Sequence, residues 1–203
     1  SWLIVRPRYV ARREHATQFS YHLLAFTREE QFQWEAEIVL GDNSMTIPPW
    51  GFGAAPPVGA DVDGDGRYEI LVAVRAQSGA LYCLDDRGQT KWKVDIPGQW
   101  VTEPVVADLN GDGMLEILTG AQDRLLVYNG IGQLIDERQI SGRPGPAVVG
   151  DIDVDGWLEV VVGTDAGDLL CLVAGPCEWG DIPWSKYRRT VWNWGVVPIG
   201  GGQ

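Results

Sequence analysis

Short apolar runs alternate with polar, glycine-rich segments along most of this chain. The three clearest runs each follow an acidic segment, and they occupy residues 69–74, 116–121 and 159–164. Continuous apolar runs of this length, rich in Val, Ile and Leu, predict strands that are buried on both faces of a sheet. No segment shows a sustained helical period. The pattern therefore predicts an all-β fold.

The same arrangement recurs around each acidic segment. A short apolar stretch after a proline precedes it, and two more strand-like runs follow, separated by a turn rich in Gly, Asn and Asp. The acidic segments begin at Asp61, Asp108 and Asp151, so they recur 47 and then 43 residues apart. A period in the forties indicates a repeat architecture. Each repeat is predicted to be four short antiparallel strands, with the acidic loop between the first and the second.

Repeats of this kind predict the blades of a β-propeller, with about four blades visible. The first blade fits the template only from its second strand, which begins at Trp2, so its first strand and its loop are expected upstream of Ser1. The chain is therefore expected to be incomplete at the N-terminus. The predicted blades span residues 1–48, 56–97, 103–141 and 145–174, and an aromatic and basic tail spans residues 175–203.

The three acidic loops share a pattern of oxygen-bearing side chains that suits a metal ion. These side chains stand at positions 1, 3, 5 and 9, and a glycine at position 6 permits a sharp turn. Oxygens in alternation are typical ligands of calcium, which takes about six to eight of them. The predicted ligands, including the backbone carbonyl of position 7, are Asp61, Asp63, Asp65, Arg67 and Glu69; Asp108, Asn110, Asp112, Met114 and Glu116; and Asp151, Asp153, Asp155, Trp157 and Glu159.

Two other interpretations of these loops compete with calcium sites. Solvated turns are also rich in Asp and Gly, but three loops in one register favour metal sites. An EF-hand loop carries a bidentate Glu at position 12 and lies between helices. Position 12 is Val72, Thr119 or Val162, inside a predicted strand, so an EF-hand is rejected. We predict about three Ca²⁺ ions, with the second site the weakest because Asn110 removes one charge.

The formal net charge of −12 limits the classes of partner. It argues against nucleic acid and against an anionic membrane surface, and no apolar run is long enough for membrane insertion. Eleven of the 28 acidic residues lie in the three loops. Without metal these carboxylates repel one another, so folding is expected to be linked to calcium.

The three cysteines do not form a disulfide framework. Cys83 and Cys171 occupy matching, apolar-flanked positions in two repeats, so we expect both to be small core residues. A local bridge between Cys171 and Cys177 stays open.

The residues around the first loop resemble a known repeat family. Phe52-Gly53-Ala54-Ala55-Pro56 precedes the loop that begins at Asp61, and this order is similar to FG-GAP/VCBS-type propeller repeats, the family that includes the integrin α-subunit head. The other two repeats keep the proline, the strand and the loop but lack the Phe-Gly. The segment 183–195 resembles a stretch that ends many bacterial secreted proteins of this type. The resemblance implies structural calcium and an extracellular location, and leaves the activity open.

Catalytic and ligand-binding residues are less clearly indicated. His15 and His22 are the only candidate neutral-pH bases, and both are expected at the surface. Trp34 and Trp92, at matching positions, are expected to pack between blades. Trp50, Trp100 and Trp157 fall in or near loops, where an exposed aromatic side chain can stack on a sugar or anchor a protein; for Trp157 both interpretations stay open.

The favoured function is an extracellular or cell-surface, calcium-stabilised propeller that serves as a binding, adhesion or assembly module without catalysis. Its expected partner is a protein or a glycan, and a homo-oligomer or the rest of a longer chain is expected to complete the propeller. Two alternatives remain open: the propeller of a polysaccharide-processing, lyase-like enzyme, and a purely structural subunit of a larger assembly.

Overall fold

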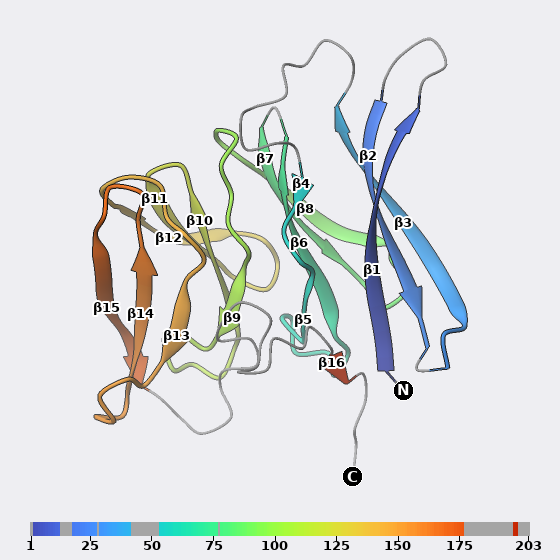
Figure 1. Ribbon diagram of the computed structural model, residues 1–203. Helices are drawn as coiled ribbons and strands as arrows, with labels where there is room; N and C mark the ends of the chain where they lie inside the picture. The colour runs from blue at the N-terminus through green and yellow to red at the C-terminus, as the bar shows by residue number, and fades with distance from the viewer. Residues whose placement is uncertain are drawn as a thin grey trace.

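The computed structural model describes residues 2–12, 18–27, 29–41, 53–76, 78–176 and 197–198. All regular elements in these ranges are β-strands, so the predicted all-β class is confirmed. The strands form four antiparallel sheets that stand side by side in chain order (Figure 1). No helix in the described part of the chain has the length and apolar character needed to cross a membrane.

The first sheet has the strand order β16-β1-β2-β3. Its strands are β1 (Trp2–Arg12), β2 (Gln18–Phe26), β3 (Phe32–Gly41) and β16 (Val197–Pro198). Leu3 lies opposite Val197, and Trp2 lies opposite Pro198. The place that we expected a strand upstream of Ser1 to fill is thus taken by a C-terminal strand, because the free edge of β1 offers unpaired backbone groups to any extended segment.

The second sheet contains β4 (Gly53–Ala54), β5 (Val58–Ala60), β6 (Glu69–Arg75), β7 (Gly79–Leu84) and β8 (Thr90–Ile96). Both β4 and β5 pair with β6. They are two halves of one first strand, interrupted at Pro56 and Pro57, since proline has no N–H for the ladder.

The third and fourth sheets repeat this plan. The third has the order β12-β11-β10-β9, with β9 (Val105–Ala107), β10 (Glu116–Ala121), β11 (Arg124–Tyr128) and β12 (Leu134–Gln139). The fourth has three strands in the described residues: β13 (Val148–Gly150), β14 (Trp157–Gly163) and β15 (Leu169–Pro176).

The outer strand pairs of the first three sheets share one register. Each contains an irregularity at the same place, between Ala25 and Phe26, between Cys83 and Leu84, and between Val127 and Tyr128. In each sheet, the last residue before this irregularity pairs with one residue of the outer strand. That residue is Trp34 in the first sheet, Trp92 in the second and Asp136 in the third.

Three hydrophobic clusters lie between consecutive sheets. The first joins Tyr21 and Leu23 to Val72, the second joins Leu71 and Leu81 to side chains of the third sheet, and the third lies between the third and fourth sheets. All residues of β10, and all but the last of β6, are buried. The prediction of strands buried on both faces is therefore confirmed for residues 69–74 and 116–121. In the third run, residues 159–164, Gly163 is exposed and Val161 and Thr164 are half-buried.

Trp34 and Trp92 each attach a sheet to the next one. The Trp34 indole N–H donates to the Asp86 carbonyl at 2.8 Å, and that of Trp92 donates to the Gly130 carbonyl at 2.9 Å. Each ring lies against a glycine with positive φ, where a Cβ would come within 2.5 Å of the Trp34 ring at Gly88 and within 2.9 Å of the Trp92 ring at Gly132. Their predicted packing between repeats is confirmed.

Trp100 also joins neighbouring sheets. Its indole N–H donates to the Pro144 carbonyl at 2.9 Å, and the guanidinium groups of Arg75 and Arg143 lie 4.4 and 5.6 Å from a ring centroid of the indole. These contacts favour a structural role for Trp100. Trp157 is 47% exposed, so its ligand-binding interpretation stays a prediction, while Trp50 lies outside the described residues.

The two matched cysteines differ in environment. Cys83 is buried between the second and third sheets, as predicted, whereas Cys171 is exposed. The expectation for Cys171 is wrong because the face of β15 that carries it has no further sheet against it in the described structure; Leu169 and Val173, on the same face, are exposed too. Cys177 lies outside the described residues.

Candidate metal sites in the acidic loops

The first aspartate of each loop holds the turn together. In the first loop, Asp61 accepts hydrogen bonds from the backbone N–H groups of Gly64, Asp65 and Gly66 at 2.9 to 3.1 Å. Asp108 accepts hydrogen bonds from the same three positions of the second loop. In the third loop, Asp151 accepts hydrogen bonds from the backbone N–H groups of positions 5 and 6. The glycine at position 6 has φ between +85° and +88° in the first and third loops, which explains the predicted need for glycine.

The glutamate at position 9 forms the buried floor of each loop. Its carboxylate accepts the backbone N–H of position 2, which is Val62 for Glu69 (3.1 Å), Leu109 for Glu116 (2.7 Å) and Ile152 for Glu159 (2.8 Å). All three glutamates are buried. Burial raises the pKa of Glu69 and of Glu116 above the ordinary glutamate value, although the backbone donors partly oppose this effect.

Two loops bring three carboxylates to one point. Oxygens of Asp61, Asp63 and Glu69 all lie within 4.8 Å of one another, and so do those of Asp151, Asp153 and Glu159. Positions 1, 3 and 9 of these loops thus converge as the sequence pattern predicts. Carboxylate oxygens gathered in this way suit a hard divalent cation.

The aspartates at position 5 have a different role in the structure. One oxygen of Asp65, Asp112 or Asp155 accepts the backbone N–H of position 7 of the same loop. The donors are Arg67 and Met114 at 2.8 Å and Trp157 at 2.9 Å. Coordination of a metal by position 5 and by the carbonyl of position 7 stays a prediction.

The first loop has a cation of its own. The ammonium group of Lys91, on β8, donates to Asp63 at 2.5 Å and to Glu69 at 2.9 Å. Its hydrogen bond with Asp63 raises the pKa of Lys91 above the ordinary lysine value, so the group stays charged at neutral pH. Sequence reasoning missed Lys91, because it lies 28 residues from Asp63 and meets the loop only through the register of β7 and β8.

The second loop uses an amide where the first uses an ammonium group. The Asn110 side-chain nitrogen donates to Asp112 at 3.1 Å and to Glu116 at 3.2 Å, while its oxygen accepts the Asp112 N–H at 2.8 Å. This arrangement satisfies the carboxylates locally. The weaker second site stays a prediction.

The third loop combines the highest uncompensated charge with a strained backbone. At position 4, Gly64 and Gly111 have φ of +74° and +78°, and Val154 has φ of +63°. A β-branched side chain in this left-handed region is costly, and Val154 is 84% exposed, so packing does not offset that cost. The sequence already shows this difference, because valine stands at position 4 where the other two loops have glycine.

The carboxylate donors of the loops fit a calcium ion best at the third loop. Four acidic side chains lie there, and no lysine or arginine contact to them is seen in the described residues. In the first loop, a metal ion must displace the Lys91 ammonium group from the oxygens of Asp63 and Glu69 or share them with it. The third loop is therefore better suited to a divalent cation than the first.

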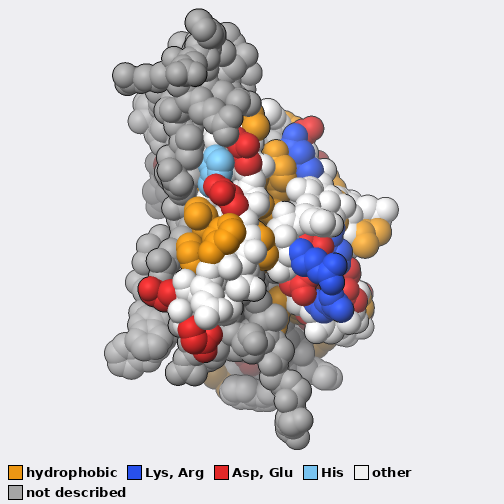
Figure 2. Space-filling view, turned by 90° about the vertical axis from the view of Figure 1, so that its right-hand side faces the viewer, with side chains coloured by type: hydrophobic (Ala, Val, Ile, Leu, Met, Phe, Trp, Pro, Cys, Tyr) orange, Lys and Arg blue, Asp and Glu red, His pale blue; other side chains and the backbone are white. Residues whose placement is uncertain are grey.

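A separate polar chain lies in the first sheet, where sequence reasoning did not place a site. Ser20 and the Nε2 atom of His22 are 2.8 Å apart, and the His22 Nδ1 atom is 2.7 Å from Glu35. Figure 2 shows this side of the molecule, where histidine and acidic side chains gather beside a group of hydrophobic ones. The prediction of a surface His22 is wrong, because it is 6% exposed. Ser20 and Glu35 lie within hydrogen-bond distance of its two ring nitrogens, so the buried ring is satisfied. His15 lies outside the described residues.

This polar chain has the order of a nucleophile, a base and an acid. Ser20, however, is only 2% exposed, so a substrate does not reach its hydroxyl group in this conformation. The arrangement accounts for a satisfied buried histidine.

The fold and the loops together define a repeat protein of antiparallel sheets with an acidic loop after each first strand. Residues 61–119 match the family model of the FG-GAP-like repeat. The matched residues run from the first acidic loop into the strand after the second. Among curated proteins, none matches this chain significantly.

Several solved structures are distantly similar to the chain. A protein of unknown function from Bacteroides caccae is 19% identical, with 88% of this chain and 59% of that chain covered and a TM-score of 0.41. BBS1N in complex with ARL6DN is 11% identical over 88% of this chain and 67% of that chain, with a TM-score of 0.43. BamB from Moraxella catarrhalis is 12% identical over 82% of this chain and 56% of that chain, with a TM-score of 0.37. This chain thus spans about 59% of the length of the Bacteroides caccae protein.

Proposed function

We propose that this chain is part of a calcium-stabilised β-propeller that acts as a non-catalytic binding or assembly module. The observation that carries the proposal is the convergence of Asp151, Asp153 and Glu159 within 4.8 Å, repeated by Asp61, Asp63 and Glu69. Calcium bound there supplies positive charge that offsets carboxylate repulsion between the first and second strands of a sheet. The metal is structural in this proposal.

The energetic effect of such binding is large enough to matter for folding. A ligand present at ten times its dissociation constant stabilises the folded state by about 1.4 kcal/mol per site. Small domains are stable by only about 5–15 kcal/mol. Three occupied loops therefore change the balance between the folded and unfolded chain.

A location outside the cell is part of the proposal. It rests on the likeness of the loops to FG-GAP repeats and on the high calcium concentration that weak structural sites of extracellular modules need. The partner is proposed to be a protein or a glycan that contacts the loop end of the sheets, where the exposed Trp157 lies. Completion of the propeller by further chain or by a second copy belongs to the same proposal.

The rival proposal is a lyase-like enzyme that acts on a polysaccharide. It rests on family resemblance, and the buried Ser20–His22–Glu35 chain is the described group of residues that comes nearest to catalytic order. Depolymerisation of an acidic or neutral glycan by the whole chain, abolished by His22→Ala, would favour it over the binding module.

Thermal unfolding in calcium, in magnesium and in chelator tests the metal proposal. We expect calcium to raise the midpoint and magnesium to raise it less, because magnesium demands a smaller octahedral site. Glycan-array binding that disappears in chelator would support the binding role. Identical midpoints in calcium and in chelator would refute the structural role of the metal.

A further inference from the structure

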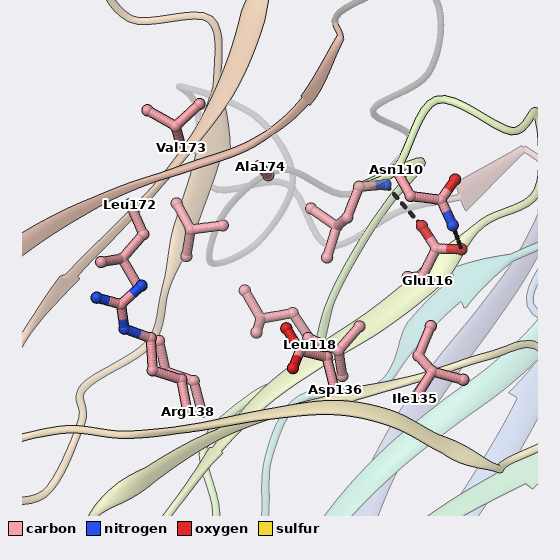
Figure 3. Close-up of a pocket in the computed structure, with 13 residues that line it drawn as sticks. Asn110, Glu116, Leu118, Ile135, Asp136, Arg138, Leu172, Val173 and Ala174 are labelled. Carbon is pink, nitrogen blue, oxygen red and sulfur yellow. Dashed lines mark hydrogen bonds between the residues drawn. The ribbon is translucent and has the colours of Figure 1, made fainter.

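The third repeat lacks the tryptophan that joins the first two repeats to their neighbours. Asp136 stands at the register position of Trp34 and Trp92, opposite the residue before the shared irregularity. A pocket of about 220 Å³ lies at this place, between the third and fourth sheets, and Asp136 lines it (Figure 3). The pocket between the third and fourth sheets thus corresponds to the space that the Trp92 indole fills between the second and third sheets.

The walls of the pocket support this equivalence residue by residue. Trp92 packs against a cluster that contains Leu71, Cys83, Ile117 and Tyr128. The same positions one repeat later are Leu118, Val127, Val160 and Leu172, and all four line the pocket.

The residue at the position of the indole's acceptor also lines the pocket, within β15 rather than in a turn. Trp34 and Trp92 donate to the carbonyls of Asp86 and Gly130, which follow Leu84 and Tyr128 by two residues. The corresponding residue after Leu172 is Ala174, which also lines the pocket. Figure 3 shows Ala174 on the side of the pocket formed by β15 and the Asp136 carboxylate beside Leu118.

We propose that this pocket binds an indole-class amine, meaning a bicyclic aromatic ring with an N–H donor and a cationic side chain. A dry cavity of about 150 Å³ already accepts a benzene ring, so about 220 Å³ suits a bicyclic ring. The ring N–H donates to the Ala174 carbonyl, as the two tryptophans do in their own interfaces. The ligand amine lies toward Asp136.

The charges at the pocket favour a cationic ligand over an anionic one. Asp136, Glu116 and Arg138 are the charged residues that line it, which leaves one net negative charge. Glu116 is engaged by Leu109 and Asn110, whereas Asp136 belongs to the exposed strand β12 and meets solvent. The inference does not rest on the proposed function, and its test is run in chelator because Asn110 and Glu116, which line the pocket, are also predicted calcium ligands.

Methyl NMR titration of the whole chain with tryptamine tests the proposal. We expect saturable shifts of the methyl groups of Leu118, Val127, Val160 and Leu172, and weaker binding of indole and of indole-3-acetate. Asp136→Trp should fill the pocket from within, abolish these shifts and raise the thermal midpoint. Gln139→Trp, at the exposed end of the same strand, is the matched control and should leave tryptamine binding unchanged.

Asp136→Asn keeps the size of the side chain and removes its charge. We expect it to weaken tryptamine binding several-fold while leaving the affinity for indole as it was. Absence of saturable methyl shifts in the native chain would overturn the proposal. So would tryptamine binding that survives Asp136→Trp, or an equal affinity for tryptamine and indole-3-acetate.

Discussion

The Lys91 ammonium group lies 2.9 Å from the buried Glu69 carboxylate and thus places a side-chain cation inside the first acidic loop. Neither of the other two loops receives a lysine or arginine in the described structure. Three loops with one sequence pattern therefore differ in charge: the first is partly neutralised by lysine, the second by an amide, and the third carries four acidic side chains.

Lys91→Met is predicted to have opposite effects with and without calcium. In chelator, the loss of the ammonium group leaves Asp63 and the buried Glu69 unpaired, and we expect a destabilisation of about 1–2 kcal/mol, since the lysine is partly exposed. In calcium, the first loop should bind the ion more tightly. Urea unfolding under both conditions measures this, and Lys93→Met, which removes an exposed pair with Asp95, is the control.

Val154→Gly is predicted to stabilise the third loop. Val154 has φ of +63°, where glycine has no steric penalty, and relief of such strain is worth about 1 kcal/mol. The larger conformational freedom of glycine in the unfolded chain offsets part of this gain. Chemical denaturation of the metal-free chain measures the change, and a marked loss of stability would show that the backbone at this position is not strained.

Trp92→Phe is predicted to weaken the contact between the second and third sheets. The substitution removes the hydrogen bond to the Gly130 carbonyl and part of the ring that lies against Gly132, and we expect a cost of about 1–2 kcal/mol. Trp157→Phe changes an exposed ring and should cost much less. Equal unfolding midpoints for the two variants would contradict the attachment role of Trp92.

Cys83 and Cys171 are predicted to react with thiol reagents at very different rates. Burial raises the pKa of the Cys83 thiol, so its reactive thiolate is scarce in the folded chain, while Cys171 is exposed. Peptide mapping after brief alkylation should find label at Cys171, and label at Cys83 only after unfolding. Early labelling of Cys83 would mean that the core between the second and third sheets opens readily.

Features set by local pattern could be predicted from the sequence. The buried strands after Glu69 and Glu116, the glycine at position 6 and the packing of Trp34 and Trp92 all depend on a residue and its near neighbours. The convergence of positions 1, 3 and 9 belongs to the same group, because one short loop carries all three.

Features set by register between distant segments could not be predicted. Lys91 reaches Asp63 only through the pairing of β7 with β8, and β16 joins β1 from the other end of the chain. The Ser20–His22–Glu35 chain depends on the register of β2 and β3. The pocket at Asp136 becomes visible only when three strand registers are compared.

Calorimetric titration of the whole chain with calcium, beside Asp153→Ala, tests the metal sites most directly. Asp153 is suitable because Asp151, Asp155 and Glu159 hold the turn of the third loop. We predict saturable binding to the native chain and loss of the tightest site in the variant. An absence of calcium binding at millimolar concentration, or an unchanged tightest site in Asp153→Ala, would contradict the account.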